Sequence, residues 1–223
     1  MNTLSILFIT SFIFLPIFAL AQTHTDVLLP KPSFTGKKSV EEAIKARRTV
    51  RHFKAKALNL EQLSQILWAA YGVTANGFYK SVPSAGALYP LDIWVAAGKN
   101  EVEGLQAGVY HYIPKAHRLT QVKAGELRDD IARASLYQSW MAEAPVILII
   151  TGEYERCTRK YGERGIPYTY IEAGHAGQNI FLQAEVLGLG IGIVGAFHND
   201  VVQKVLGIGK VYDPILIMSV GYK

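Results

Sequence analysis

Three arginines lie close together in the sequence RRTVR, at positions 47–51. Arg47, Arg48 and Arg51 share this stretch with the hydroxyl of Thr49. A guanidinium group presents a planar fork of donors that matches phosphate oxygens, so the cluster suits an anionic group held in a fixed orientation. A solvated basic helix end is the alternative interpretation. Because no longer basic stripe or aromatic platform lies nearby, we expect no nucleic-acid partner.

A lysine and a tyrosine form a second candidate site. Lys160 and Tyr161 are followed by Arg164 and stand just before the longest helical pattern. In a partly apolar pocket such a pair can act as general acid and base, because burial and neighbouring charges tune both pKa values. Solvated loop residues are the alternative interpretation.

A third stretch, residues 81–90, is rich in small residues and suits close approach to a flat ligand. Ala85, Gly86 and Ala87 carry little side chain that would obstruct such a ligand. A merely flexible loop is the alternative. Ser84 lacks the second half of a nucleophile elbow, which argues against a hydrolase.

Two other patterns fail the context that their chemistry needs. The sequence GIGIVG at 190–195 matches a dinucleotide fingerprint, but a long helix precedes it and a strand is expected to run through it. Glu172 and His175 match half of a di-iron motif, which requires a second copy that this chain lacks. The remaining histidines show no ligand spacing, so we expect no metal site.

Composition indicates one well-cored globular domain. Of the 223 residues, 50% are hydrophobic and 18% are charged, which excludes a disordered chain. The net charge of +5 is modest and does not identify a partner. The single cysteine, Cys157, excludes an intrachain disulfide framework.

The N-terminal segment predicts export. Residues 4–21 form an uncharged apolar run that ends in Ala-Leu-Ala, which is typical of a signal peptide (residues 1–21) cleaved before Gln22. An uncleaved membrane anchor is the alternative, and the only membrane contact that we expect. The protein is accordingly expected in the periplasm or secreted, with residues 22–37 as a linker or extended arm.

The rest of the chain, residues 38–223, is expected to form an α+β domain around one sheet. Ser39 and Glu42 make a capping box that starts a helix, and Asn59 starts a second helix that Gly72 closes. Further helices are expected at 127–136, 171–187 and 200–206. Strands are expected at 91–97, 109–113, 119–122, 146–151, 190–196 and 214–221, with 146–151 buried on both faces.

Taken together, these stretches resemble the nitroreductase-like flavoprotein superfamily, and within it the azole-forming dehydrogenase (SagB/ThcOx-type) branch. The matching sequences are RRTVR (47–51), PSAGALYP (83–90), KYGER (160–164), EAGHAGQN (172–179) with LGLG (187–190), and VGAF (194–197). They follow the family order from about residue 38 onward.

The resemblance implies a central mixed sheet flanked by helices, in an interlocked homodimer that binds FMN at the subunit interface. Arg47, Arg48, Thr49 and Arg51 would hold the phosphate, the ribityl chain and the pyrimidine side of the flavin. Pro83, Ser84, Ala85 and Gly86 of the other subunit would lie along the isoalloxazine. Val194, Gly195 and Ala196 would offer backbone groups near the reactive flavin nitrogen.

In the azole-forming branch a Lys-Tyr pair assists proton removal while FMN takes a hydride, and by position Lys160 and Tyr161 match it as catalytic residues. The expected substrate is therefore a small molecule or a modified peptide. An NAD(P)H-dependent nitro or quinone reductase and a non-catalytic flavin-binding relative are the alternatives. Many nitroreductases also have a basic C-terminal tail at the FMN phosphate, for which Lys223 is a candidate substitute.

Overall fold

The computed structural model describes residues 25–223, so the predicted signal peptide lies outside the described residues. The strands are β1 (Asp26–Leu28), β2 (Leu91–Ala97), β3 (Gly108–Ile113), β4 (Arg118–Ala124), β5 (Val146–Gly152), β6 (Leu189–Val194) and β7 (Asp213–Tyr222). The α-helices are α1 (Val40–Ala46), α2 (Leu60–Tyr71), α3 (Arg128–Ala134), α4 (Glu155–Tyr161), α5 (Gly165–Val186) and α6 (Asn199–Leu206). Within residues 25–223 no helix is both long and apolar enough to cross a membrane.

All of these strands join one seven-stranded sheet in the order β1-β4-β3-β2-β5-β7-β6. Each neighbouring pair of strands is antiparallel. Parallel pairing occurs in the described residues only as isolated bridges, such as the one between Thr49 and Ile191. The expected α+β fold is confirmed, and the parallel part of its mixed sheet consists of these bridges.

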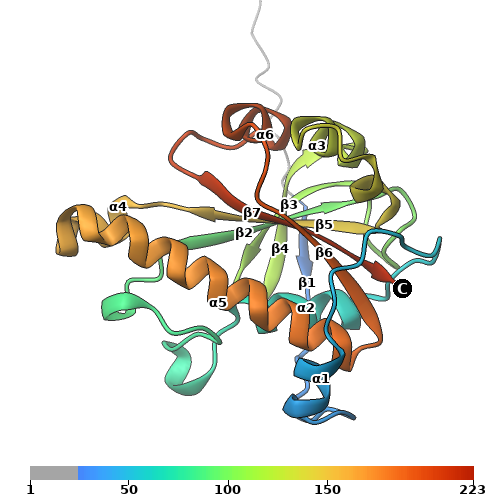
Figure 1. Cartoon of the computed structure of the whole chain (residues 1–223), viewed down its shortest axis with the longest axis horizontal. Coiled ribbons are helices and arrows are strands. Elements are labelled where there is room, and N and C mark those ends of the chain that lie inside the picture. The colour runs from blue at the N-terminus through green and yellow to red at the C-terminus, as the bar shows by residue number, and fades with distance from the viewer. Residues whose placement is uncertain (1–24) are drawn as a thin grey trace, which may run out of the picture.

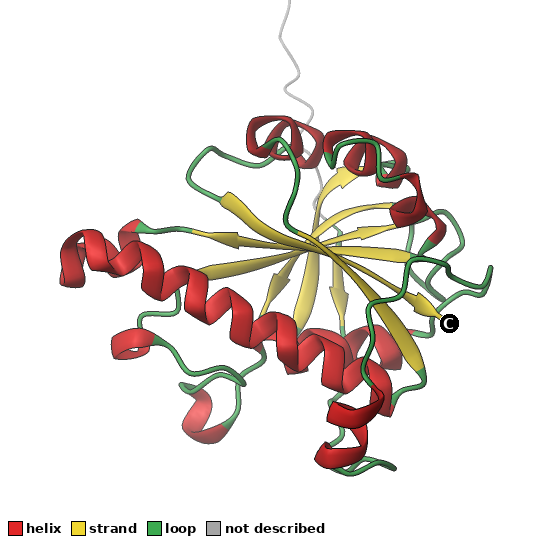
Figure 2. Ribbon diagram, in the orientation of Figure 1, coloured by secondary structure: helices red, strands yellow, loops and turns green. Residues whose placement is uncertain are grey.

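Helices cover both faces of the sheet. Figures 1 and 2 show α5 lying across one face together with α2 and α1, while α3 and α6 cover the other. The core is accordingly divided into two clusters of buried side chains, one on each face of the sheet. The strand β5 lies between them with every residue buried, as its uniformly apolar sequence predicts.

The helix starts follow their capping residues. Ser39 and Asn59 each accept a hydrogen bond from the backbone N–H of the third helical residue, and both capping boxes are complete. The longest helix begins at Gly165, six positions before the expected start. Pro167 in its first turn does not prevent this, because the first N–H groups of a helix have no intrahelical acceptor.

Part of the expected N-terminal arm belongs to the sheet. Asp26, Val27 and Leu28 pair with β4 and form one edge of the sheet. Further along the arm, the Ser33 N–H donates to Gln65 Oε1 on α2 (2.8 Å). The described part of the arm is therefore attached to the domain at β4 and at α2.

Candidate active site

The arginine stretch lies alongside the outermost strand of the sheet. Its first residue, Arg47, caps α1 by donating its backbone N–H to Ala43 O (3.0 Å). The chain then becomes extended, so that Thr49 forms a parallel bridge with Ile191 of β6 and Val50 N donates to Ile191 O (2.8 Å). These contacts direct the following residues toward the end of β6.

The guanidinium groups of this stretch carry unneutralised positive charge. Arg47 is half-buried and lies over the ring of Phe181 on α5 (5.3 Å to the centroid), and Arg51 lies over the ring of Trp140 (5.8 Å). Arg48 donates to the carbonyl of Arg47 (2.8 Å). Among residues 25–223, no carboxylate forms an ion pair with any of the three arginines. An anion could therefore bind here without displacing an internal partner.

The glycines of GIGIVG allow the arginine stretch to pack against β6. A Cβ on Gly190 would lie 2.9 Å from a Val50 methyl, and one on Gly192 would lie 2.2 Å from the Trp140 ring and 2.5 Å from Val50 O. The strand runs through this sequence, and no helix opens within it, so the dinucleotide interpretation is excluded.

The strand ends in the residues expected near the flavin. Val194 is the last residue of β6 and is buried, whereas Gly195 and Ala196 are exposed. No atom lies within 4 Å of the position that a Cβ on Gly195 would take. This end of β6 therefore offers open backbone near the arginines.

The loop containing PSAG adopts an unusual conformation. Gly86, Ala87 and Tyr89 have φ values of 59°, 53° and 52°, which is the left-handed region that favours glycine. Ser84 Oγ accepts a hydrogen bond from Tyr89 N (2.9 Å) and so closes the loop on itself.

The predicted acid–base pair faces this loop. Lys160 and Tyr161 form the end of α4, so the alternative interpretation, in which they were solvated loop residues, is wrong about their secondary structure. A Cβ on Gly86 would lie 2.6 Å from the Tyr161 hydroxyl and 3.0 Å from Lys160 Nζ. The helix thus brings both polar groups to a glycine of the loop that is far from them in sequence.

A small cavity of about 250 Å³ lies between this loop and α5. Its lining combines small or apolar residues with four polar side chains: Pro83, Ser84, Ala85, Tyr168, Ile171, Glu172 and His175. The expected loop residues therefore line a cavity together with residues that were not predicted as site residues.

Glu172 is one of the lining residues that were not predicted as site residues. Its side chain is buried, with 2% of the residue exposed, and Oε1 accepts a hydrogen bond from the Tyr71 hydroxyl (2.6 Å). Burial raises the pKa of Glu172, while the Ser84 and Tyr71 hydroxyls and the charges of Lys80 and His175 act to lower it. The half di-iron pattern is therefore explained by a buried carboxyl group that bonds to a tyrosine.

Lys80 is held beside this carboxyl by two aromatic rings. Its ammonium lies 3.6 Å from the centroid of the Tyr71 ring and 4.8 Å from that of Tyr89. Burial lowers the pKa of Lys80 to about 8, although the charges of Asp92 and Glu172 oppose the change.

Within one chain the two halves of the candidate site are separated along α5. Arg47 contacts Phe181, whereas the cavity beside Ser84 includes Glu172 of the same helix. The interval from Glu172 to Phe181 corresponds to roughly 13 Å along a helix axis at about 1.5 Å per residue. The structure thus brings Lys160 and Tyr161 to the loop, but it does not bring the loop to the arginines.

Lys223, the candidate substitute for a basic tail, forms an internal ion pair. Its ammonium lies 2.7 Å and 2.8 Å from the two carboxylate oxygens of Glu185, which is buried on α5. A flavin phosphate would therefore have to compete with Glu185 for this ammonium.

Comparison with known proteins identifies the family of this fold. The sequence profile described as "Nitroreductase family" matches residues 44–222. A nitroreductase-family protein of Methanocaldococcus jannaschii is 46% identical over 184 residues, which are 82% of this chain and 91% of that protein. The chain therefore belongs to the nitroreductase family, and it is an oxidoreductase.

Solved structures agree in fold. A crystal structure of a nitroreductase-family protein from Ralstonia eutropha JMP134 superposes with a TM-score of 0.78 at 26% identity, covering 92% of both chains. The microcin B17-processing protein McbC of Escherichia coli is 25% identical over 74% of this chain and 62% of its own length. A structure of the E. coli microcin synthetase McbBCD complex with truncated pro-MccB17 matches with a TM-score of 0.68 at 22% identity.

Proposed function

We propose that the protein is an FMN-dependent oxidoreductase that transfers a hydride between bound flavin and a small or peptide-borne organic substrate. One observation carries the proposal: three arginines without ion-pair partners in the described residues lie beside β6, whose end is open backbone. Arg47, Arg48, Thr49 and Arg51 would bind the phosphate, the ribityl chain and the pyrimidine side. Gly195 and its neighbours would face the isoalloxazine.

A second copy of the chain would complete the site. The arginines and residues 83–86 of one chain contact different parts of α5. A flavin held by the arginines of one chain would therefore need residues 83–86 of a partner along its ring system. Exposed apolar side chains on α1 and on the first turns of α5 support a homodimer; they are Val40, Ile44, Ile166, Tyr170 and Ile171. Their burial in a dimer would remove apolar surface from water.

The reaction would need both a hydride carrier and a group that accepts a proton. FMN, when bound, supplies the acceptor or donor of the hydride. Lys160 Nζ and the Tyr161 hydroxyl both face Gly86, so a proton released from substrate at the loop would have an acceptor beside it. The small residues Ala85 and Gly86 leave room for the ring system.

Two observations bear on the substrate. The similarity to McbC, a processing protein for microcin B17, supports a modified peptide and an azole-forming dehydrogenation. The 46% identity to the M. jannaschii nitroreductase-family protein supports the second candidate, an NAD(P)H-dependent nitro or quinone reductase. If the apolar N-terminal run exports the protein, NAD(P)H is scarce at its destination, which favours the dehydrogenase.

An absorbance spectrum of the purified chain from Gln22 onward, before and after anaerobic addition of NADPH, tests the proposal. A flavin spectrum that NADPH leaves unchanged supports the dehydrogenase, with substrate as the electron donor. A flavin spectrum that NADPH bleaches supports the reductase. Bound FMN that no donor reduces would indicate a non-catalytic relative, and failure to bind added FMN would refute the assignment of the arginines.

Substitution of the acid–base pair tests the mechanism. Lys160→Ala and Tyr161→Phe are expected to lower turnover by a factor of roughly 10²–10⁴ while FMN stays bound. Unchanged rates with FMN still bound would remove both residues from the reaction.

A further inference from the structure

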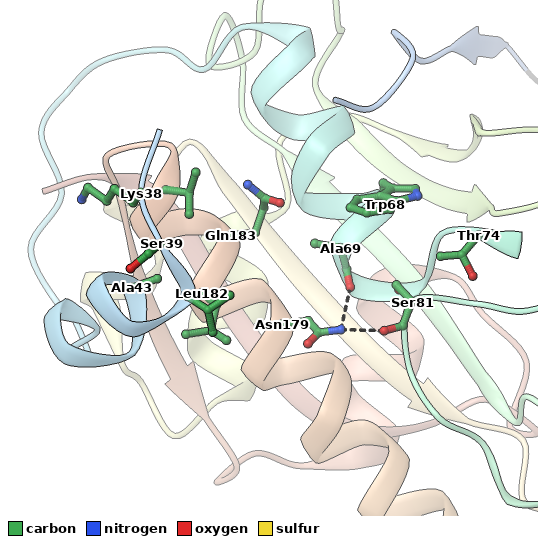
Figure 3. A pocket seen from close by; sticks show the side chains of 12 residues that line it. Lys38, Ser39, Ala43, Trp68, Ala69, Thr74, Ser81, Asn179, Leu182 and Gln183 are labelled. Atoms are coloured by element: carbon green, nitrogen blue, oxygen red, sulfur yellow. Dashed lines mark hydrogen bonds between the residues drawn. The ribbon is translucent and has the colours of Figure 1, made fainter. Parts of the chain in front are cut away.

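The loop formed by residues 81–91 is attached to α5 at both of its ends. At the first end, Asn179 Nδ2 donates hydrogen bonds to the carbonyl oxygens of Ser81 (2.9 Å) and Ala69 (3.2 Å), as Figure 3 shows. At the other end, Leu91 N donates to the Tyr71 hydroxyl (3.1 Å). That hydroxyl in turn donates to Glu172 Oε1, so the second attachment passes through a tyrosine of α2.

The two attachments start from one face of one helix. Glu172 and Asn179 are spaced i and i+7 on α5, which places them about two turns apart on the same side. They are the first and last residues of the EAGHAGQN sequence. One side of α5 therefore carries the residues that lead to both ends of the loop.

The loop between these points needs external support. Gly86, Ala87 and Tyr89 have left-handed φ values, and for the two residues with a Cβ this conformation is costly and persists only when surrounding contacts impose it. Other side chains help: Tyr89 Oη accepts from Lys80 N (3.2 Å), and an Arg156 guanidinium donates to Tyr89 O (3.3 Å).

We propose that Glu172 and Asn179 are positioning residues that fix both ends of this loop and thereby hold Ser84, Ala85 and Gly86 in the shape that meets the flavin. The link to the flavin rests on the proposed function, whereas the link to the loop stands on the hydrogen bonds alone. Neither residue needs to touch substrate or cofactor to have this effect.

The environment of Glu172 supports a role beyond packing. A carboxyl group that is 2% exposed is costly to bury, and its Oε2 has no hydrogen-bond partner in the part of the chain that the structure describes. An apolar side chain at this position would avoid that cost but would leave the Tyr71 hydroxyl without its acceptor. The buried carboxyl is therefore retained with polar contacts to the loop, through the Tyr71 hydroxyl and through the neighbouring Ser84 hydroxyl.

Amide hydrogen exchange of the full chain without FMN tests the attachment directly. In Glu172→Ala, Tyr71→Phe and Asn179→Ala, exchange of the peptide covering 81–91 is expected to rise by roughly threefold to tenfold, the effect of losing about one net hydrogen bond. Because Glu172 and Leu91 share the Tyr71 hydroxyl, the double variant Glu172→Ala/Tyr71→Phe should raise loop exchange by less than the product of the two single effects.

A conservative substitution and a matched control separate positioning from general stability. Glu172→Gln keeps an acceptor for Tyr71 and is expected to restore protection of the loop. Glu185→Ala removes another buried carboxylate of α5, which forms ion pairs with Lys38 and Lys223 away from the loop. It should lower stability without selectively exposing residues 81–91. Loop exchange that is the same in Glu172→Ala and Glu185→Ala would overturn the proposal.

Flavin titration extends the test to the cofactor. If wild type binds FMN, the three loop variants should bind it roughly threefold to tenfold more weakly, with an altered visible circular dichroism spectrum, and Glu172→Gln should resemble wild type. Altered loop exchange in a chain that binds no FMN would refute the proposed function and leave the positioning role standing. Unchanged exchange in a chain that binds FMN would refute the positioning role alone.

Discussion

The Tyr161 hydroxyl lies 2.6 Å from the point where a Cβ on Gly86 would stand. This contact joins two sequence motifs that are far apart in the chain, and it requires a residue without a side chain at position 86. The same residue has a φ of 59°, so both its space and its backbone favour glycine.

Gly86→Ala is therefore expected to displace Tyr161 and Lys160 and to lower turnover. Gly104→Ala is the matched control, because Gly104 also has a positive φ of 75° but nothing lies within 4 Å of its added Cβ. Both changes should cost about 1 kcal/mol of stability from backbone strain. Only the first should reduce the rate, and equal rates in the two variants would contradict the role of the contact.

Arg47→Ala and Arg51→Ala are each expected to weaken FMN binding by roughly 10-fold to 100-fold, because a charge-assisted hydrogen bond contributes about 1.5–3 kcal/mol. The loss should shrink at high salt, where the charges are screened. Arg159→Ala is a suitable control, since Arg159 is exposed and paired with Glu155 on α4. Fluorescence titration with FMN measures the affinity of all three variants. If Arg47→Ala and Arg51→Ala bound FMN as tightly as Arg159→Ala, the assignment of these arginines to the FMN site would be contradicted.

Gly192→Ala is expected to destabilise the fold by roughly 1–3 kcal/mol through overpacking. Its Cβ would lie 2.2 Å from the Trp140 ring and 2.5 Å from the backbone oxygen of Val50, which cannot move without the arginine stretch. Gly190→Ala, whose nearest contact is a Val50 methyl at 2.9 Å, should cost less. Urea denaturation of both variants would refute this ranking if Gly190→Ala proved the more damaging.

Protonation of Glu126 at low pH should lower the stability of the fold. Burial opposes its ionisation, but hydrogen bonds from the Arg128 side chain and from the backbone of Lys99 and Arg128 lower the pKa of Glu126 from 4.5 to about 2. An acid whose pKa is lowered on folding stabilises the fold above its unfolded pKa, and this contribution disappears as the pH falls from about 4.5 to 2.

Glu126→Gln should therefore be less stable than wild type at pH 7, by roughly 0.5–1 kcal/mol for so exposed a pair. Denaturation curves at several pH values should show this difference narrowing below pH 4.5. A difference that stays constant down to pH 3 would contradict the explanation.

Much of the fold follows from local sequence signals. Ser39 and Asn59 mark helix starts because their side chains cap the first N–H groups, and the apolar run of β5 marks a strand buried on both faces. The strand β1 could not be predicted in the same way. Asp26 to Leu28 become a strand only because β4, far along the chain, provides their hydrogen-bond partners.

Sequence alone could propose site residues only where residue type indicates chemistry, as for the arginines and for Lys160 with Tyr161. Glu172 was not proposed, because its meaning depends on burial and on a tyrosine of another helix. Its i, i+7 spacing from Asn179 was a visible signal, but only the loop between Ser81 and Leu91 shows what the two residues hold.

The place of β7 in the sheet has a consequence for how the protein is made. This strand is the last in sequence, yet it lies between β5 and β6 rather than at an edge. Until its residues leave the ribosome, β5 and β6 each present an unpaired edge, and such edges invite pairing with other chains. The domain therefore cannot complete its core before β7 has been made, and chains truncated before residue 213 should aggregate rather than persist as smaller folded units.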